Sequence, residues 1–151
     1  MTVHHKPLHI INLETCDSTN DYLKQNHLKL QSQFPVLVTS AEQIKGRGRE
    51  DRKWVSLKNR GIYSSFGFFL NLNISLTLMP IICGISVIET LQKISGQEFY
   101  LKWPNDILYK GKKIAGILIE NIVQGPKVVS IAGIGINLNH MQKDFPKPLE
   151  K

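Results

Sequence analysis

Glycine and arginine alternate in one short segment of the chain, Gly46-Arg47-Gly48-Arg49, and Arg52, Lys53 and Trp54 follow it closely. Glycine lets the backbone approach a ligand closely, and the arginine guanidinium group offers a fork of donors that suits phosphate oxygens. The segment lacks the Gly-Lys-Ser/Thr ending of a P-loop. We predict that residues 46–54, the glycine–arginine loop, form a mobile loop that binds an anionic ligand, although the same residues taken alone are also typical of a solvated basic loop.

Three further segments have residue types that suit the same chemistry. Lys102-Trp103-Pro104-Asn105-Asp106 contains a run typical of a tight turn. Lys113 enters a segment that is otherwise apolar, and Gly133-Ile134-Gly135-Ile136-Asn137 places glycines in a strand, which they weaken unless another group approaches closely. Each segment alone is also explained by a hairpin turn, a solvent-facing lysine or a weak strand. Together, the four segments predict one ligand site.

The positive charge of the chain is concentrated in two of these regions. The 151 residues contain 19 Lys and Arg against 12 Asp and Glu, a net charge of +7. Residues 43–60 hold seven basic and two acidic side chains, and residues 102–113 hold four basic and one acidic, so the remainder is close to neutral. Charge gathered in this way indicates a local anionic ligand rather than a generally basic protein.

The composition excludes several classes of protein. With 42% hydrophobic and 21% charged residues, the chain is neither disordered nor fibrous, and its length predicts a single domain over 1–151. Cys16 and Cys83 are too few for a disulfide framework or a multi-cysteine metal site, which favours a reducing compartment. The five histidines have no metal-ligand spacing, so no metal site built from protein ligands is expected.

The sequence gives no sign of export or of a membrane span. The first seven residues lack the apolar core of a signal peptide. Residues 61–88 carry no charge and are long enough to raise a membrane span, but polar residues and Pro80 interrupt them. We therefore read this stretch as strand, loop and helix, and expect a soluble cytoplasmic chain without a membrane partner.

The elements that must position these residues alternate between helix and strand. A helix is predicted from the N-cap Ser18 to about Leu28, and a second over 81–94, with Pro80 in its first turn and Gly96 at its end. Strands are predicted at 8–13, 36–39, 63–70, 99–103, 107–109, 114–119 and 128–136, with a Lys-Gly-Lys hairpin turn before 114. This order indicates an α+β fold with a mixed, largely antiparallel sheet flanked by helices.

In combination, the motifs resemble the biotin–protein ligase family, the biotin–[acetyl-CoA-carboxylase] ligases. Asp17-Ser18-Thr19-Asn20, Gln43, the glycine–arginine loop, Lys102–Asp106, Lys113-Ile114-Ala115-Gly116-Ile117-Leu118 and the Gly133–Asn137 strand follow in family order. The resemblance covers roughly residues 8–139. It implies the fold of the biotin/lipoate ligase catalytic domain, which is similar to that of class II aminoacyl-tRNA synthetases.

The resemblance also implies a two-step reaction. ATP and biotin give biotinyl-5′-AMP and pyrophosphate, with Mg²⁺ at the triphosphate, and a lysine of a biotin carboxyl carrier protein then takes the biotinyl group. Lys113 would contact the biotin carboxyl and the α-phosphate. Arg47 and Arg49 would help neutralise these anions, and Asp106 would orient or deprotonate the incoming amine.

Two sets of binding residues follow from the same resemblance. The biotin set is Ser18, Thr19, Asn20, Gln43, Gly46, Arg47, Lys113 and Gly116. The ATP and adenylate set is Arg47, Gly48, Arg49, Arg52, Trp54, Lys113 and Asn137. The loop would close over the adenylate and protect it from water.

The sequence departs from the family pattern in two respects. Glu50-Asp51 places two acids beside the phosphate-binding arginines, where they would weaken anion binding or pair with Arg52 or Lys53. Neither an N-terminal helix-turn-helix nor a C-terminal SH3-like domain is expected, so DNA binding is not expected either. The catalytic domain itself is expected to be C-terminally short, with a loop around Pro146 and Pro148.

Alternatives to an active biotin ligase stay open. One is a lipoate or octanoyl ligase or transferase of the same fold, although the Ser-Thr-Asn and Gln43 set favours biotin. Another is an inactive remnant that binds biotin or nucleotide. A third is a nucleic-acid binding module, whose affinity would depend steeply on salt, although only Trp54 among the aromatics lies beside the arginines. A homodimer formed through the sheet also stays open.

Overall fold

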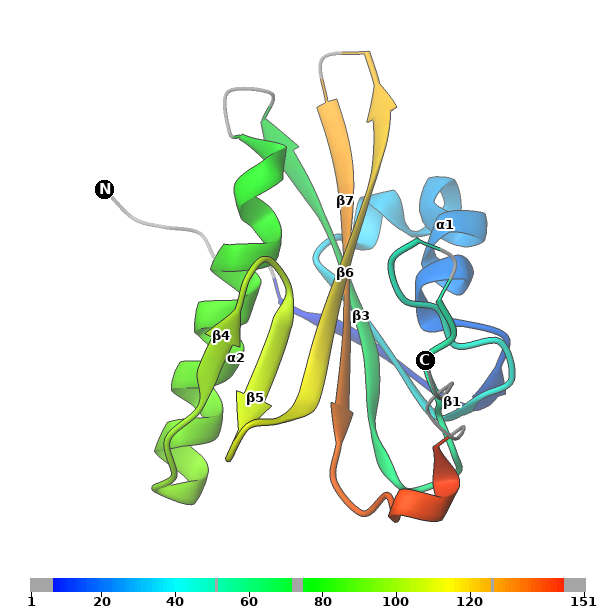
Figure 1. Cartoon of the computed structure of the whole chain (residues 1–151). Helices are drawn as coiled ribbons and strands as arrows, with labels where there is room; N and C mark the ends of the chain where they lie inside the picture. Colours follow the sequence, from blue (N-terminus) through cyan, green and yellow to red (C-terminus); the bar gives the residue numbers. More distant parts are fainter. Residues whose placement is uncertain (1–6, 51, 72–74, 126, 146–151) are drawn as a thin grey trace.

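The computed structural model describes residues 7–50, 52–71, 75–125 and 127–145. Asp51, Pro146 and Pro148, on which part of the sequence interpretation rests, lie outside these residues. Within the described residues, the elements are β1 (His9–Cys16), α1 (Thr19–Leu30), η1 (Gln31–Gln33), β2 (Val36–Gln43), β3 (Gly61–Asn71), η2 (Leu76–Leu78), α2 (Met79–Ser95), β4 (Tyr100–Lys102), β5 (Asp106–Tyr109), β6 (Lys112–Gln124), β7 (Lys127–Asn137) and η3 (Gln142–Asp144) (Figure 1).

The strands of the described residues form one seven-stranded sheet in the order β1-β2-β3-β7-β6-β5-β4. Strands β1 and β2 are parallel, because α1 connects them, and the other neighbouring pairs are antiparallel. This arrangement confirms the predicted α+β fold with a mixed, largely antiparallel sheet. Strand β6 is much longer than the predicted 114–119, because β7 pairs with it as far as Gln124.

The ends of both helices follow the local signals. The Ser18 hydroxyl oxygen accepts a hydrogen bond from the backbone N–H of Asp21 at 3.4 Å, which caps α1. Pro80 lies in the first turn of α2. Gly96 ends that helix in the left-handed conformation, with φ at 66°.

The two helices cover opposite faces of the sheet. Leu23 of α1 packs in a cluster with Val36, Val38, Val129 and Ile131, whereas Cys83, Val87 and Ile88 of α2 pack on a second cluster, formed by Ile107, Ala115, Ile117 and Ile136. Along β6, Ile117 therefore faces α2, and Glu120 reaches the side chains of α1. The long connection between β2 and β3 lies on the α1 side, because its Arg47 contacts Asp21.

One helical segment has the length and composition of a membrane span. Residues Leu76–Ser95 are long and apolar enough by those two criteria, which some core helices of soluble proteins also meet. Part of this segment packs on the sheet, and Ile82, Ile85 and Ile94 are exposed. The expectation of no membrane partner stays a prediction.

Candidate functional site

A cavity of about 310 Å³ opens on the α1 side of the sheet, and most of the predicted site residues line it. The predicted residues in its wall are Ser18, Thr19, Asn20, Gln43, Arg47, Gly48, Arg49, Arg52, Trp54, Asp106, Lys113 and Gly116. Gly46 and Asn137 are not among the lining residues. The four segments singled out in the sequence thus meet around one hollow.

One end of the cavity is a network of short polar side chains. Gln43 Oε1 accepts hydrogen bonds from the Thr19 backbone N–H at 2.8 Å and from Thr19 Oγ1 at 3.1 Å. Gln43 Nε2 donates to Ser56 Oγ at 2.8 Å. The Ser65 hydroxyl lies 2.7 Å from Thr19 Oγ1 and 2.5 Å from Asn20 Oδ1. Ser65 is fully buried on β3, and the sequence interpretation missed it because an isolated serine in a strand carries no motif.

The strand glycines form the floor of the cavity, and side chains of this same chain cross it. A Cβ placed on Gly116 would lie 3.0 Å from Trp54 Cζ3, and one on Gly135 would also meet the Trp54 indole. A Cβ on Gly133 would overlap the amide of Asn20. The expectation that another group approaches these glycines closely is confirmed, and the groups are Trp54 and Asn20.

The glycine–arginine loop folds back on itself. The Trp54 backbone N–H donates to Gly46 O at 2.8 Å, and the Gly48 N–H donates to Arg52 O at 2.7 Å. Gly46 is buried, and a Cβ there would overlap the carbonyl oxygen of Trp54. Gly46 therefore lets two strands of backbone come together, whereas its predicted contact with biotin stays a prediction.

The acid within the loop pairs with its own neighbours. Glu50 Oε2 accepts from Arg52 Nη2 at 2.7 Å, and Glu50 Oε1 lies 4.0 Å from Arg49 Nη2. The expected pairing of an acid with Arg52 is thus confirmed for Glu50. The exposure of these side chains means that the pairs contribute little to stability.

Lys113 reaches the cavity because of a β-bulge in β6. Across the β5–β6 pair, Leu108 is opposite Lys113 and Ile107 is opposite Ala115, so Ile114 has no partner of its own. A bulge places two successive residues on the same face and redirects the one before them. Ile114 and Ala115 both pack toward α2, and Lys113 turns to the cavity, where Nζ lies 2.7 Å from Asp106 Oδ1 and 5.3 Å from the centre of the Trp54 ring.

A hydrogen bond joins the glycine–arginine loop to the turn before β5. Arg49 Nη1 donates to Asn105 Oδ1 at 3.2 Å. Asn105 Nδ2 in turn donates to the carbonyl oxygen of Ile117 at 2.8 Å, which fixes the amide against β6. Two segments separated by about fifty residues of sequence therefore close one side of the cavity, as the combined motifs predicted.

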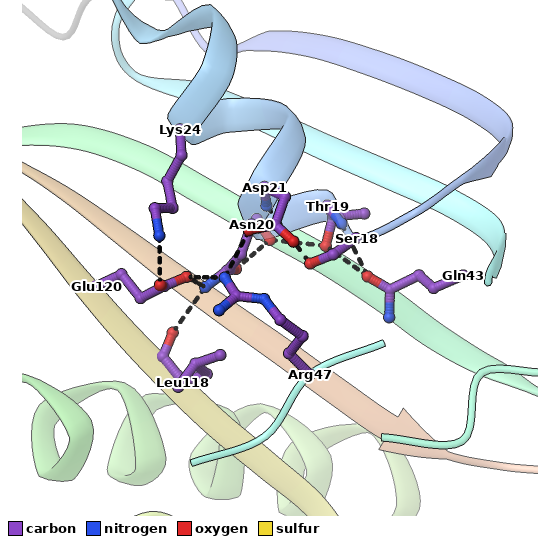
Figure 2. A network of polar contacts seen from close by, with 10 residues as sticks. Ser18, Thr19, Asn20, Asp21, Lys24, Gln43, Arg47, Leu118 and Glu120 are labelled. Atoms are coloured by element: carbon purple, nitrogen blue, oxygen red, sulfur yellow. Dashed lines mark hydrogen bonds and ion pairs between the residues drawn. The ribbon is translucent and has the colours of Figure 1, made fainter. Parts of the chain in front are cut away.

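Arg47 lies differently from Arg49, because its guanidinium group is bound to two carboxylates. Arg47 Nη2 donates to Asp21 Oδ1 at 2.6 Å and to Glu120 Oε2 at 2.7 Å (Figure 2). Burial lowers the pKa of Arg47, but the bonds to Glu120 and Asp21 outweigh it and leave the pKa above its ordinary value. The sequence interpretation missed Glu120. Its signal is a single charge that follows the apolar run 114–119 directly.

Asn137 lines a second hollow, which shares Trp54 with the first. Its lining residues are Lys53, Trp54, Val55, Lys113, Asn137 and Phe145. The Asn137 side-chain oxygen is buried and has no hydrogen-bond partner among the described residues. Trp54 and Lys113 line both hollows, which agrees with the expected neighbourhood of Trp54 and Asn137. Their contact with adenine stays a prediction.

Comparison with known proteins agrees with this arrangement of residues. The model of the biotin/lipoate A/B protein ligase family matches residues 13–137. The chain belongs to this family. The bifunctional ligase/repressor BirA of Bacillus spizizenii is 36% identical to it and aligns with 94% of this chain. The structure of the biotin protein ligase from Aquifex aeolicus in complex with biotin and ATP is 37% identical over 92% of this chain, with a TM-score of 0.72.

Other members of the family differ from this chain in length and in sequence. The chain spans 44% of the Bacillus BirA and 55% of the Aquifex ligase chain. The structure of P. falciparum LipL1 in complex with lipoate has a TM-score of 0.59 at 12% identity, a likeness that concerns the fold alone. The Bacillus BirA and the Aquifex biotin protein ligase are therefore much closer to this chain in sequence than the lipoate-bound protein.

Proposed function

We propose that this chain carries the biotin- and ATP-binding centre of a biotin–protein ligase. The observation that supports this most is the convergence of Lys113, Arg49 and Asn105 on one cavity whose opposite end holds Thr19 and Gln43. Cations at one end suit phosphates and a carboxylate. Fixed donors and acceptors at the other suit the ureido ring of biotin, which offers both kinds of group.

In the first step, a carboxylate oxygen of biotin attacks the α-phosphorus of ATP, and the bond to pyrophosphate breaks. Two anions must approach each other, so a cation at the reacting atoms lowers the barrier. Lys113 lines both hollows, and in this proposal its ammonium group supplies that cation. Arg49, held at Asn105, would meet the phosphates from the loop side.

In the second step, the neutral amine of a carrier lysine attacks the biotinyl carbonyl carbon, and AMP leaves with the electron pair of the anhydride bond. The amine loses a proton in this step, and a carboxylate nearby can accept it. Asp106 lines the cavity and is about one-fifth exposed, with its Oδ1 already bonded to Lys113. The acceptor in this proposal is a biotin carboxyl carrier protein.

Mg²⁺ is proposed to enter with ATP. This ion is usually bound by one or two carboxylates together with substrate phosphates and water. Glu50 and Asp106 line the cavity, and the described residues contain no group of three His, Cys, Asp or Glu able to hold a metal. The donor set fits an ion held chiefly by the phosphates. We also propose a cytoplasmic location, which the free thiols of Cys16 and Cys83 support.

The test is biotin-dependent release of pyrophosphate from MgATP, followed by mass analysis of a carrier domain. We expect both signals with biotin and neither without it. Binding of biotin without pyrophosphate release would indicate a binding remnant instead. Competition calorimetry in which lipoate or octanoate binds and biotin does not would replace the proposal with the lipoate alternative. Tight, salt-dependent nucleic-acid binding in the absence of any biotin affinity would support a nucleic-acid module.

A further inference from the structure

One carboxylate connects three separate parts of the chain next to the cavity. Glu120 Oε2 accepts hydrogen bonds from Asn20 Nδ2 at 2.9 Å and from Arg47 Nη2 at 2.7 Å, and Glu120 Oε1 accepts from Lys24 Nζ at 2.9 Å (Figure 2). Asn20 and Lys24 come from α1, Arg47 from the glycine–arginine loop and Glu120 from β6. Helix, loop and sheet therefore meet on a single side chain.

Asp21 completes the set of charges around Arg47. Its Oδ1 lies 2.6 Å from the same Arg47 Nη2, so one guanidinium nitrogen serves two carboxylates. Lys24 and Arg47 balance Asp21 and Glu120 in charge. Burial raises the pKa of Glu120, but its bonds to Lys24, Asn20 and Arg47 outweigh burial and leave the pKa below its ordinary value. Removing Glu120 from this partly buried group would leave Lys24 without this partner and Arg47 with Asp21 alone, and removing Asp21 would leave Arg47 with Glu120 alone.

The same carboxylate fixes a residue of the polar end of the cavity. Asn20 is buried, donates to Glu120 and to the carbonyl oxygen of Leu118, and accepts from Ser65 through its Oδ1. Its amide lies directly over Gly133 on the cavity floor. Glu120 thus contacts a residue of the predicted biotin set and a residue of the loop at once, without lining the cavity itself.

We propose that Glu120 and Asp21 are positioning residues for the glycine–arginine loop. By binding Arg47, they fix the start of the loop against α1 and β6, so that Arg49, two residues further on, reaches Asn105. The role of the anchored loop in catalysis rests on the proposed function. The anchoring itself does not, since it is a property of the chain without ligand. Arg47 in this account is an anchor, and Arg49 is the arginine offered to the ligand.

The test uses trypsin on the folded chain without ligand, with mass spectrometry to identify cleavage after Arg49, Arg52 and Lys53. Cleavage of a folded protein by trace protease follows the population of the opened segment. Charge-assisted bonds of this kind contribute enough that we expect cleavage of the loop about tenfold faster in Glu120→Gln and in Asp21→Asn. The asparagine variant keeps the proposal testable if the glutamine variant does not fold.

Two matched variants separate anchoring from a general loss of stability. Lys24→Gln removes a partner of Glu120 but leaves Arg47 bound, and Asp17→Asn breaks an exposed pair with Lys45, at 2.8 Å, at the start of the same connection. Both should leave cleavage of the loop near the parent rate, because Lys24→Gln keeps both carboxylates on Arg47 and the exposed pair of Asp17 with Lys45 contributes little. In an Arg47→Met background, Glu120→Gln should add no further acceleration, since the contact it breaks is already absent.

The functional readout is a split between binding and turnover. With the loop released, KM for biotin and ATP should rise more than kcat falls, because Lys113 remains in place. Unchanged loop cleavage in both carboxylate variants, or additive effects with Arg47→Met, would overturn the proposal whatever the chain binds. Faster loop cleavage in a chain that has no affinity for biotin would instead leave the anchor standing and remove the proposed function.

Discussion

Lys113 Nζ lies 2.7 Å from Asp106 Oδ1, so the cation proposed to meet the reacting anions already contacts a carboxylate of the same chain. Both side chains line the cavity, and Lys113 is less than half exposed. A substrate carboxylate and an α-phosphate arriving here would compete with Asp106 for the ammonium group. Displacement of Asp106 in the first step would leave it free to accept a proton in the second.

Replacement of Lys113 by alanine should abolish adenylate formation. Without the ammonium group, two anions would meet uncompensated, and removing one such electrostatic contact typically slows a reaction by about 10²–10³-fold. The measurement is the rate of biotin-dependent pyrophosphate release. Lys112→Ala is the matched control, because this neighbouring lysine of β6 does not line the cavity. Normal pyrophosphate release by Lys113→Ala would refute the role.

Replacement of Arg49 by glycine should weaken retention of the adenylate. Arg49 joins the loop to the turn before β5 through its bond to Asn105 at 3.2 Å, so its loss removes both a phosphate donor and a closing contact. We expect biotinyl-5′-AMP to dissociate at least about tenfold faster, since a charged hydrogen bond contributes about 1.5–3 kcal/mol. Release of labelled adenylate reports this, with Lys58→Ala, an exposed lysine of the same connection, as control. An equal off-rate in parent and variant would contradict it.

Replacement of Gly133 by alanine should destabilise the fold at the cavity floor. A Cβ there would overlap the Asn20 amide, which is buried and bonded to Ser65, Glu120 and Leu118. Overpacking of this kind costs about 1–3 kcal/mol in the free energy of unfolding. Urea denaturation measures it. Gly48→Ala is the control, since its Cβ would make only an ordinary contact with Arg52 at 3.4 Å. If Gly133→Ala lowers the free energy of unfolding no more than Gly48→Ala does, the argued overlap with Asn20 is wrong.

Tyr63 should make the fold sensitive to alkali. Burial, and secondarily the charge of Glu42, raises the pKa of Tyr63 from 10.0 to about 12. Between these two values the unfolded chain loses the phenolic proton and the folded chain keeps it, so stability falls as pH rises, by about 2–3 kcal/mol in total. Denaturation from pH 9 to 12 measures this. Tyr63→Phe also loses the bond to the Leu57 carbonyl oxygen at 2.9 Å, which lowers stability at every pH, but its profile should be flatter above pH 10.

Local signals were sufficient for the helices and for the identity of most cavity residues. Ser18, Pro80 and Gly96 each act within one or two turns of the helix they bound, so the sequence alone predicts where α1 and α2 start or stop. Six of the seven strands in the described residues were predicted too short, β6 most of all, whereas the predicted 99–103 is longer than β4. The polar residues of β6 beyond 119 stay in the ladder because β7 supplies hydrogen-bond partners, which no local pattern encodes.

The orientation of the arginines depended on partners distant in sequence. Arg47 and Arg49 look equivalent in the Gly-Arg-Gly-Arg segment, yet Arg47 binds carboxylates 26 residues before it and 73 residues after it, whereas Arg49 binds Asn105. Asp21 looks like an ordinary acid in the first turn of a helix, and Glu120 like a strand residue facing solvent. Only the packing of α1 on the sheet brings them together.

The bulge at Ile114 makes the position of Lys113 depend on the register of β6 as well as on residue type. Had Lys113 alternated regularly with Ala115, it would share the α2 face with that alanine, and its ammonium group would be separated from Asp106 by the thickness of the sheet. Loss of the bulge with Ile114 still in the chain would therefore remove the cation from the cavity while leaving every candidate site residue in the sequence. A change in the local register of this strand can thus silence a site that a comparison of motifs alone would score as intact.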